Sequence, residues 1–201
     1  MTPVARNILI ACIAGFLLDQ YVLAGLRDTF ALWPLHDLPV MPSFQPWQLV
    51  SYAFLHGDLL HLFFNMFALY MFGSSVEELM GSRRFLVYYL VCVVTAAIAQ
   101  LVVQQVMGGF PRPTVGASGG VFGLLLAYGL AFPHRKLMLI FPPIPMPAWL
   151  FVTLYGLLEL YLGFTARNSS VAHFAHLGGM AGGLLLILYW RAQARRGNFR
   201  R

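Results

Sequence analysis

The sequence predicts an all-α membrane protein, a six-transmembrane-helix bundle with a short central fourth helix. Of its 201 residues, 59% are hydrophobic and only 10% are charged, whereas soluble domains carry about 25% charged residues. The mean hydropathy is +0.72. We expect a single domain over residues 1–190 and a basic tail over residues 191–201. Six apolar runs have the composition of membrane spans: Ile8–Leu26, Leu59–Met80, Phe85–Val106, Ser118–Phe132, Ala148–Phe164 and Val171–Trp190.

The first run and the connection after it carry unusual polar and aromatic residues. Asp19 and Gln20 lie inside the first run, so this side of the helix must face a partner helix or water. The run is too long for the apolar core of a cleaved signal peptide. The long connection from Arg27 to Asp58 contains Trp33 and Trp47, and such residues typically lie at the membrane interface. We therefore expect a structured element in this connection.

The connection between the second and third runs is very short. It consists of Gly81–Arg84 alone, which predicts a tight hairpin of two helices. Glu77 and Glu78 precede it, and we expect them to brace the hairpin by pairing with Arg83 or Arg84.

The fourth run is too short to cross a bilayer fully. Ser118–Phe132 holds 15 residues, about 22 Å of helix against a hydrocarbon core of about 30 Å. If this helix ends at the cytoplasmic face, Ser118 lies part-way down the membrane, reached by the loop residues Gly116 and Ala117. The proline-rich connection Pro133–Pro147 is expected to be a stiff linker. Glu159 lies within the fifth run, and the sequence assigns it no partner.

Basic residues predict the orientation. With six spans both termini lie on the same side, and this side carries ten of the 13 Lys and Arg residues. Such an excess is typical of the cytoplasmic side, so both termini are expected in the cytoplasm. The positive charges lie at helix ends, where topology accounts for them, and we expect no nucleic-acid partner. The basic tail would also attract the anionic headgroups of the lipid bilayer.

Polar side chains from three runs are expected to meet at one depth near the outer face. His61 and Asn65 lie one turn apart on the second run, and both can donate hydrogen bonds to a developing oxyanion. Ser118 begins the fourth run, where free backbone N–H groups favour negative charge. His176 lies early in the sixth run. A serine beside a histidine and an electropositive backbone suits acyl transfer.

Small residues predict that the fourth and sixth runs pack closely. Gly119 and Gly123 are four residues apart, as are Gly179 and Gly183. Such pairs let two helix backbones approach each other, which could bring His176 within hydrogen-bond reach of Ser118. We interpret His56 and His173 as structural residues.

Three motifs together resemble the rhomboid intramembrane serine proteases. They are H-x-x-x-N at His61–Asn65, G-x-S-G at Gly116–Gly119, and A-H-x-x-G-x-x-x-G at Ala175–Gly183. Their order and their runs agree with a rhomboid-like six-helix bundle, and the resemblance extends from about Trp47 to Gly183. The chain departs from the family at Gln48, since an arginine often follows the tryptophan there, and the bracing role of that arginine is absent or moved.

The resemblance implies a Ser-His dyad, with Ser118 as nucleophile and His176 as general base. Asn65, His61 and the backbone N–H of Ser118 would form the oxyanion hole, and Phe122 would stack on the ring of His176. It implies no acidic third member near the histidine and no cofactor. Substrates would be the transmembrane segments of membrane-anchored proteins. The minimal size resembles the bacterial form, which implies the inner (plasma) membrane, and the oligomeric state is not defined.

Two other classes of function compete with proteolysis. A catalytically inactive rhomboid-like chaperone or binding protein would lack one dyad member, and both are present. A small transporter or metal site could be built on four histidines, His56, His61, His173 and His176. These histidines lack the H-E-x-x-H spacing and a nearby carboxylate in the sequence. We therefore predict no metal site.

Overall fold

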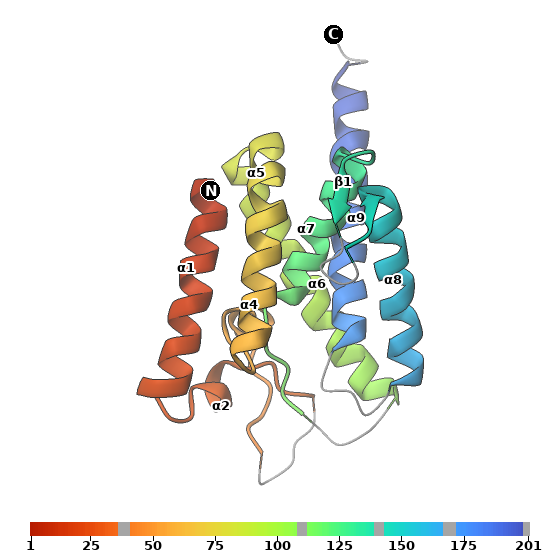
Figure 1. Ribbon diagram of the computed structural model, residues 1–201. Helices are drawn as coiled ribbons and strands as arrows, with labels where there is room; N and C mark the ends of the chain where they lie inside the picture. Colours follow the sequence, from red (N-terminus) through yellow and green to blue (C-terminus); the bar gives the residue numbers. More distant parts are fainter. Residues whose placement is uncertain (36–40, 108–111, 139–142, 167–171, 199–201) are drawn as a thin grey trace.

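In the computed structural model of the chain, residues 1–35, 41–107, 112–138, 143–166 and 172–198 are described, and they form a helical bundle (Figure 1). A shorter apolar helix spans Ser118–Ala131. This architecture confirms the predicted helical membrane bundle with a short fourth helix. Five helices are long and apolar enough to cross a membrane: Pro3–Val22, Leu59–Met80, Ser82–Met107, Ala148–Thr165 and His173–Arg196.

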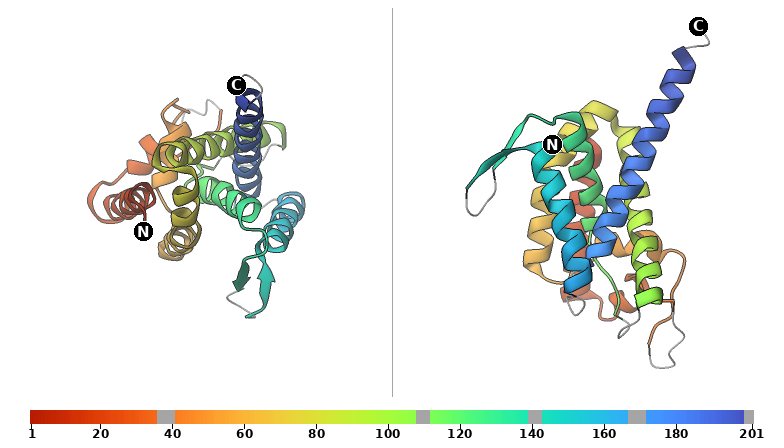
Figure 2. Two further views of the ribbon diagram at one scale, coloured as in Figure 1. Left: turned by 90° about the horizontal axis from the view of Figure 1, so that it is seen from above. Right: turned by 90° about the vertical axis from the view of Figure 1, so that its right-hand side faces the viewer.

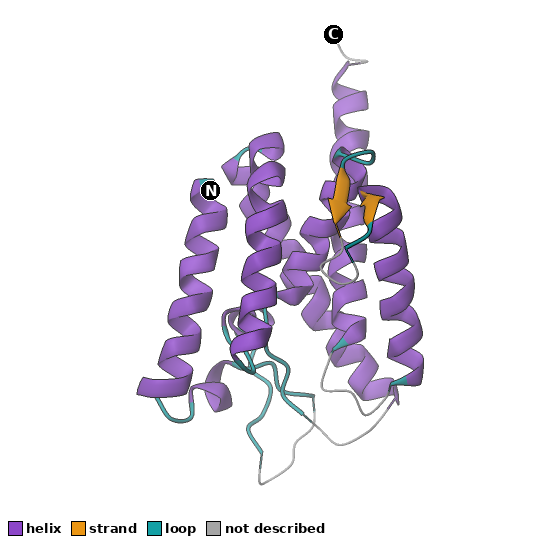
Figure 3. Ribbon diagram, viewed as in Figure 1, coloured by secondary structure: helices purple, strands orange, loops and turns teal. Residues whose placement is uncertain are grey.

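Helix accounts for nearly all of the regular structure (Figure 3). The α-helices are α1 (Pro3–Leu17), α2 (Leu26–Phe30), α3 (Gln48–Ser51), α4 (Leu59–Ala68), α5 (Ser74–Met80), α6 (Ser82–Met107), α7 (Ser118–Ala131), α8 (Ala148–Thr165) and α9 (His173–Asn198). A π-helical stretch at Leu18–Val22 extends α1, and a second one at Leu69–Gly73 joins α4 to α5. A 3-10 turn covers Tyr52–Phe54.

The first span differs from its predicted bounds. It begins at Pro3 and its π-helical end stops at Val22, whereas the apolar run continues to Leu26. Gly25 has a φ of +85°, a left-handed conformation that glycine adopts readily and that interrupts a helix. Leu26 therefore belongs to a separate short helix, α2, outside the span.

The short helix α7 lies inside the bundle, where it contacts α4, α6, α8 and α9 (Figure 2). Ten of its 14 residues are buried. A helix at the edge of a bundle buries only one stripe, so burial on all sides fits a central position. The helix begins part-way along α6 and α9 (Figure 1), which places its first residue, Ser118, within the bundle.

Glycines allow α7 and α9 to approach almost backbone to backbone. A Cβ at Gly179 would collide with the carbonyl group of Gly119, and a Cβ at Gly123 would lie 3.3 Å from the carbonyl oxygen of Gly179. Gly182 and Gly183 lie about one turn further along α9 and make room for side chains of α6. The predicted close packing of the fourth and sixth spans is therefore confirmed, although Gly183 serves the contact with α6.

Glu77 has a different role from the predicted one. Its carboxylate accepts hydrogen bonds from the backbone N–H groups of Val4 at 3.1 Å and Ala5 at 2.8 Å, and from the hydroxyl of Ser82 at 2.6 Å. The first N–H groups of a helix have no partner within the helix, and they attract a carboxylate. The predicted pairing of Glu77 with Arg83 or Arg84 is therefore wrong: Glu77 fastens the start of α1 to α5.

The connection Pro133–Pro147 is not a simple stiff linker. In its described part, strand β1 (Lys136–Met138) pairs antiparallel with strand β2 (Pro145–Pro147). Backbone hydrogen bonds from Ala148 to Arg135 and from Trp149 to Pro133 fix this hairpin to the start of α8. Proline is tolerated in β2 because a two-stranded ribbon leaves one edge of each strand unpaired.

The described part of the outer connection is structured, as predicted. Gln48 is fully buried, and its Oε1 accepts the backbone N–H groups of Trp33 and Gln45, each at 3.2 Å. Its Nε2 donates to the carbonyl of Thr29 at 3.2 Å. Gln48 therefore braces the connection itself, at the position where the resembling family often has arginine.

The contact between α7 and α9 gives a stability prediction. Gly179→Ala is expected to lower the free energy of unfolding by about 1–3 kcal/mol, because the two backbones must separate to admit a methyl group. Gly156→Ala is the matched control, since its Cβ would lie 3.4 Å from the flexible end of Met180. Thermal melts in detergent compare the two variants, and equal melting temperatures would contradict the prediction.

Candidate active site

Ser118 is the first residue of α7 and is held there by the loop before it. Thr114 pairs with Leu32 through two backbone hydrogen bonds of 2.9 and 3.0 Å, and the N–H of Gly116 donates to the carbonyl of Tyr52 at 3.0 Å. Gly116 has a φ of +124°, a conformation that side chains rarely allow. These contacts fix the backbone that leads into Ser118, whose own N–H is free of the helical ladder.

His176 on α9 lies directly against Ser118. Its Nε2 is 2.8 Å from the Oγ of Ser118, and Phe122 stacks on its ring with a centroid separation of 4.2 Å and an interplanar angle of 6°. When the hydroxyl donates to Nε2, the neutral ring carries its proton at Nδ1. The geometry therefore provides a hydroxyl next to a proton acceptor, with Phe122 setting the plane of the imidazole.

His61 faces the same place from α4. The side chain of Asp58 caps this helix by accepting the N–H of His61 at 2.8 Å. The N–H of Gly57 donates to Nδ1 of His61 at 3.3 Å, so the neutral ring keeps its proton at Nε2. A Cβ at Gly116 would lie 2.7 Å from this Nε2 and 3.8 Å from the Oγ of Ser118. The absence of a side chain at Gly116 thus leaves a histidine N–H donor beside the serine.

Asn65 lies one turn further along α4 and is buried. Its Nδ2 donates to the carbonyl of His61 at 2.9 Å, which occupies one of its two amide hydrogens and leaves the other available. The structure thus brings Ser118, His176, Phe122 and His61 into close proximity, and it places Asn65 on the same helix as His61.

Glu159 supplies a charged group that the sequence left without a partner. Its Oε2 lies 2.7 Å from Nδ1 of His173 and 2.9 Å from Nδ1 of His176, and all three side chains are buried. The expectation of no acidic group near the histidine is therefore wrong, because α8 packs against α9 and carries Glu159 to it. The spacing of His173 and His176, three residues apart on one helix face, was the signal for a shared partner.

The same three residues could hold a metal ion. One ligand atom from each of Glu159, His173 and His176 lies within 4.8 Å of the others. The short oxygen–nitrogen distances are those of direct hydrogen-bonded or ionic contacts between the side chains. His56 and His61 do not belong to this group, and His56 lies edge-on to His61 with ring centroids 5.2 Å apart.

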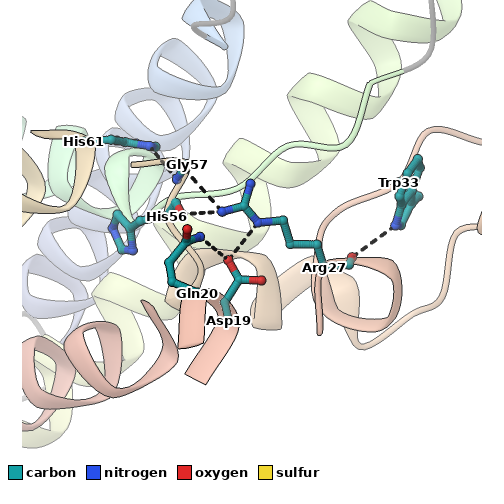
Figure 4. Close-up of polar contacts among 7 residues, drawn as sticks. All are labelled: Asp19, Gln20, Arg27, Trp33, His56, Gly57 and His61. Carbon is teal, nitrogen blue, oxygen red and sulfur yellow. Dashed lines mark hydrogen bonds and ion pairs between the residues drawn. The ribbon is translucent and has the colours of Figure 1, made fainter. Parts of the chain in front are cut away.

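A polar cluster behind His61 fixes the turn that leads into α4 (Figure 4). The guanidinium of Arg27 contacts Asp19 at 2.7 Å and donates to the carbonyls of His56 at 3.0 Å and Gly57 at 3.3 Å. The buried charge of Asp19 in the first span thus has a cation as its partner. The N–H of Gly57 donates to Nδ1 of His61 and so leaves the proton of the neutral ring on Nε2. By fixing the backbone at Gly57, the cluster helps to determine which nitrogen of His61 carries the proton.

His56 is fully buried and is neutral at physiological pH. Within the described residues, neither of its ring nitrogens has a hydrogen-bond partner. Burial is the main cause that lowers the pKa of His56 to about 4, and the neighbouring His61 adds to the effect. This agrees with a structural role, because a charge at this position would be desolvated without compensation.

The chain belongs to the rhomboid family. The family model for the Rhomboid domain matches residues 43–193. Over 142 residues the chain is 32% identical to "Rhomboid protein 1, mitochondrial" of Saccharomyces cerevisiae, which covers 70% of this chain and 41% of that protein. It is 34% identical over 139 residues to "Rhomboid protease GluP" of Bacillus subtilis, covering 68% of this chain and 24% of the relative.

Another relative covers nearly the whole chain. "Rhomboid protease GlpG" of Serratia proteamaculans is 30% identical over 200 residues, which are 98% of this chain and 65% of that protein. The chain therefore spans less than two thirds of the length of these three relatives. Together with the family match and the apolar helices, they establish an integral membrane protein of the rhomboid family.

The ion pair behind His61 gives a second prediction. Arg27→Gln is expected to lower stability by about 1 kcal/mol, because the carboxylate of Asp19 then stays buried without its cation. The Asp19 side chain is 4% exposed and that of Arg27 is 37% exposed. The double variant Asp19→Asn/Arg27→Gln is expected to melt higher than the single variant. If it melts no higher in detergent, the pairing does not matter for stability.

The buried His56 gives a pH prediction. Because the neutral form is favoured only in the folded state, the free energy of unfolding is expected to fall as the pH drops from 6.5 towards the folded-state pKa of about 4. The loss from this residue reaches about 3 kcal/mol at the acidic end. Chemical unfolding of the wild type and of His56→Gln at several pH values isolates the effect, and parallel curves would contradict it.

Proposed function

We propose that this chain is an intramembrane serine endopeptidase that cleaves transmembrane segments of membrane-anchored proteins. The observation that carries the proposal is the 2.8 Å contact between the Oγ of Ser118 and Nε2 of His176, at the start of a buried helix. A hydroxyl is a weak nucleophile unless a base takes its proton, and His176 is in place to do so. The relatives named as proteases support the same class of reaction.

The first half of the proposed reaction forms an acyl-enzyme. The Oγ of Ser118 attacks the carbonyl carbon of the scissile peptide bond as its proton moves to Nε2 of His176. The peptide oxygen then carries a negative charge. Nε2–H of His61, the free amide hydrogen of Asn65 and the backbone N–H of Ser118 are the donors proposed to stabilise it.

The second half releases both products. When the tetrahedral intermediate collapses, His176 gives the proton on Nε2 to the leaving amine, and an ester joins the substrate acyl group to Ser118. A water molecule then attacks the ester while His176 accepts its proton, and that proton returns to the Oγ of Ser118 as the carboxylic acid departs. Ser118 is partly exposed, which leaves access for this water.

The proposed setting is a lipid bilayer with both termini in the cytoplasm. The N-terminus and the C-terminal end of α9 lie at the same end of the bundle (Figure 1), which supports termini on one side. The excess of basic residues at that end supports the cytoplasmic side. The relatives include bacterial and mitochondrial proteins, and we propose the bacterial inner membrane because the bacterial relative of Serratia proteamaculans aligns with 98% of this chain.

Ser118→Ala is expected to abolish cleavage of a model transmembrane substrate, with a fall in kcat of about 1,000-fold or more and an unchanged melting temperature. A fluorophosphonate probe should label the wild type and not this variant. Ser75→Ala is the control, since Ser75 belongs to α5, which lies at the end of the bundle that carries the N-terminus (Figure 1). Retained cleavage in Ser118→Ala would refute the assignment, and a folded wild type that neither cleaves nor reacts with the probe would favour the inactive binding protein.

A further inference from the structure

The buried carboxylate of Glu159 lies where it can act on the proposed catalytic base. Its Oε2 is 2.9 Å from Nδ1 of His176, the ring nitrogen opposite the one that contacts Ser118. When Nε2 accepts the serine proton, Nδ1 already carries a hydrogen, and the imidazolium that forms has its positive charge next to this carboxylate. A carboxylate in this position stabilises the protonated form of the ring.

His173 anchors Glu159. Nδ1 of His173 makes a hydrogen bond of 2.7 Å with the same Oε2. The contact of His176 with Oε2 is close in distance but not aligned as a hydrogen bond, and among the described residues its Nδ1 has no other partner. The directional bond therefore goes to His173, and the interaction with His176 is mainly that of two charges once the ring is protonated.

Glu159 lies within a membrane span, where a carboxylate without a function would destabilise the protein. An ionised carboxylate in an apolar environment is destabilising unless it is paired and hydrogen-bonded. Glu159 is 6% exposed, and the histidines it contacts are 8% and 7% exposed. One of these partners, His176, is the residue that the proposed reaction protonates and deprotonates in every cycle.

We propose that Glu159 is a positioning residue that, anchored by His173, places its charge beside His176 and stabilises the protonated form of His176 during peptide-bond cleavage. The inference rests on the proposed function. Glu159 stays ionised throughout, and the only proton that moves is the one exchanged between Ser118, Nε2 of His176, the leaving amine and water. The proposed site then consists of Ser118, His176 and Glu159, with His173 as the anchor of Glu159, whereas the family resemblance implied only the dyad of Ser118 and His176.

Other polar groups near His176 are few in the described residues. On α6, Tyr88 and Cys92 contact Gly183, two turns further along α9. The titratable or reacting groups that face the cluster are His61 from α4, Ser118 from α7, Tyr155 from α8 and His173 from α9. Glu159 supplies the negative charge that faces the imidazole of His176, so removing this charge should change the pH dependence of the reaction.

The experiment compares Glu159→Gln with the wild type in detergent or vesicles. The amide keeps the size of the side chain and removes its charge. We expect kcat to fall at least about 10-fold with little change in KM. We also expect the acidic limb of kcat/KM to move to lower pH, because the imidazolium loses the neighbouring charge that stabilises it. A purely structural role would not move this limb.

Three control variants accompany this measurement. Glu78→Gln makes the same change at an exposed glutamate on α5 and should leave kcat and the pH profile unchanged. Glu159→Asp keeps the carboxylate and should restore the wild-type limb with part of the activity. If Glu159→Gln does not fold, His173→Gln is measured in its place, because the carboxylate then loses its anchor. An unchanged kcat and an unchanged acidic limb of kcat/KM in the folded His173→Gln variant would overturn the proposal.

Two further readouts separate the possible outcomes. If the probe labels Ser118 in the wild type while folded Glu159→Gln keeps the wild-type kcat and pH profile, the role of Glu159 is refuted and the proposed protease stands. If the wild type is neither labelled nor active, the proposed function itself fails. The assays are repeated with EDTA, and a wild-type activity that chelation abolishes would overturn the proposal in favour of a metal held by Glu159, His173 and His176.

Discussion

The contact between α7 and α9 is the constraint on which the rest of the site depends. Gly119 and Gly179 leave no side chain between the two backbones, and only at this separation can a histidine on one helix reach a serine on the other. The N-terminus of α7 is thereby fixed inside the bundle, next to α4. Dispersion contacts between closely matching surfaces stabilise such an interface in lipid. The hydrophobic effect does not drive two apolar helices together there, because the surrounding acyl chains are equally apolar.

Backbone groups, more than side chains, prepare the surroundings of Ser118. The loop before it is tied to Leu32 and Tyr52 by backbone hydrogen bonds, and the N–H of Gly57 determines which nitrogen of His61 carries the proton. Arg27 secures the turn that contains this N–H. Donors held in this way need no reorganisation when negative charge develops, which is the condition for effective electrostatic stabilisation.

Three buried carboxylates in the described part of the chain have polar partners, and these partners connect elements far apart in the chain. Asp19 joins the end of α1 to α2 through Arg27, Glu77 joins α5 to the start of α1, and Glu159 joins α8 to α9. An unpaired charge in an apolar environment is costly, so each pair also restricts how the helices can be arranged. The pair at Glu159 differs from the other two because one of its histidines contacts Ser118.

The sequence by itself predicted the number of spans, the short fourth helix and the approach of His176 and His61 to Ser118. These features follow from local rules: apolar length, the 3.6-residue period that puts His61 and Asn65 on one face, and small residues that permit close packing. The tertiary structure alone decided the partners of Glu159, Glu77 and Asp19, the hairpin of β1 and β2, and the bracing by Gln48. Each depends on which elements become neighbours in space, and a hydrogen bond or ion pair over a few ångströms cannot be read from positions that lie 8 to 73 residues apart.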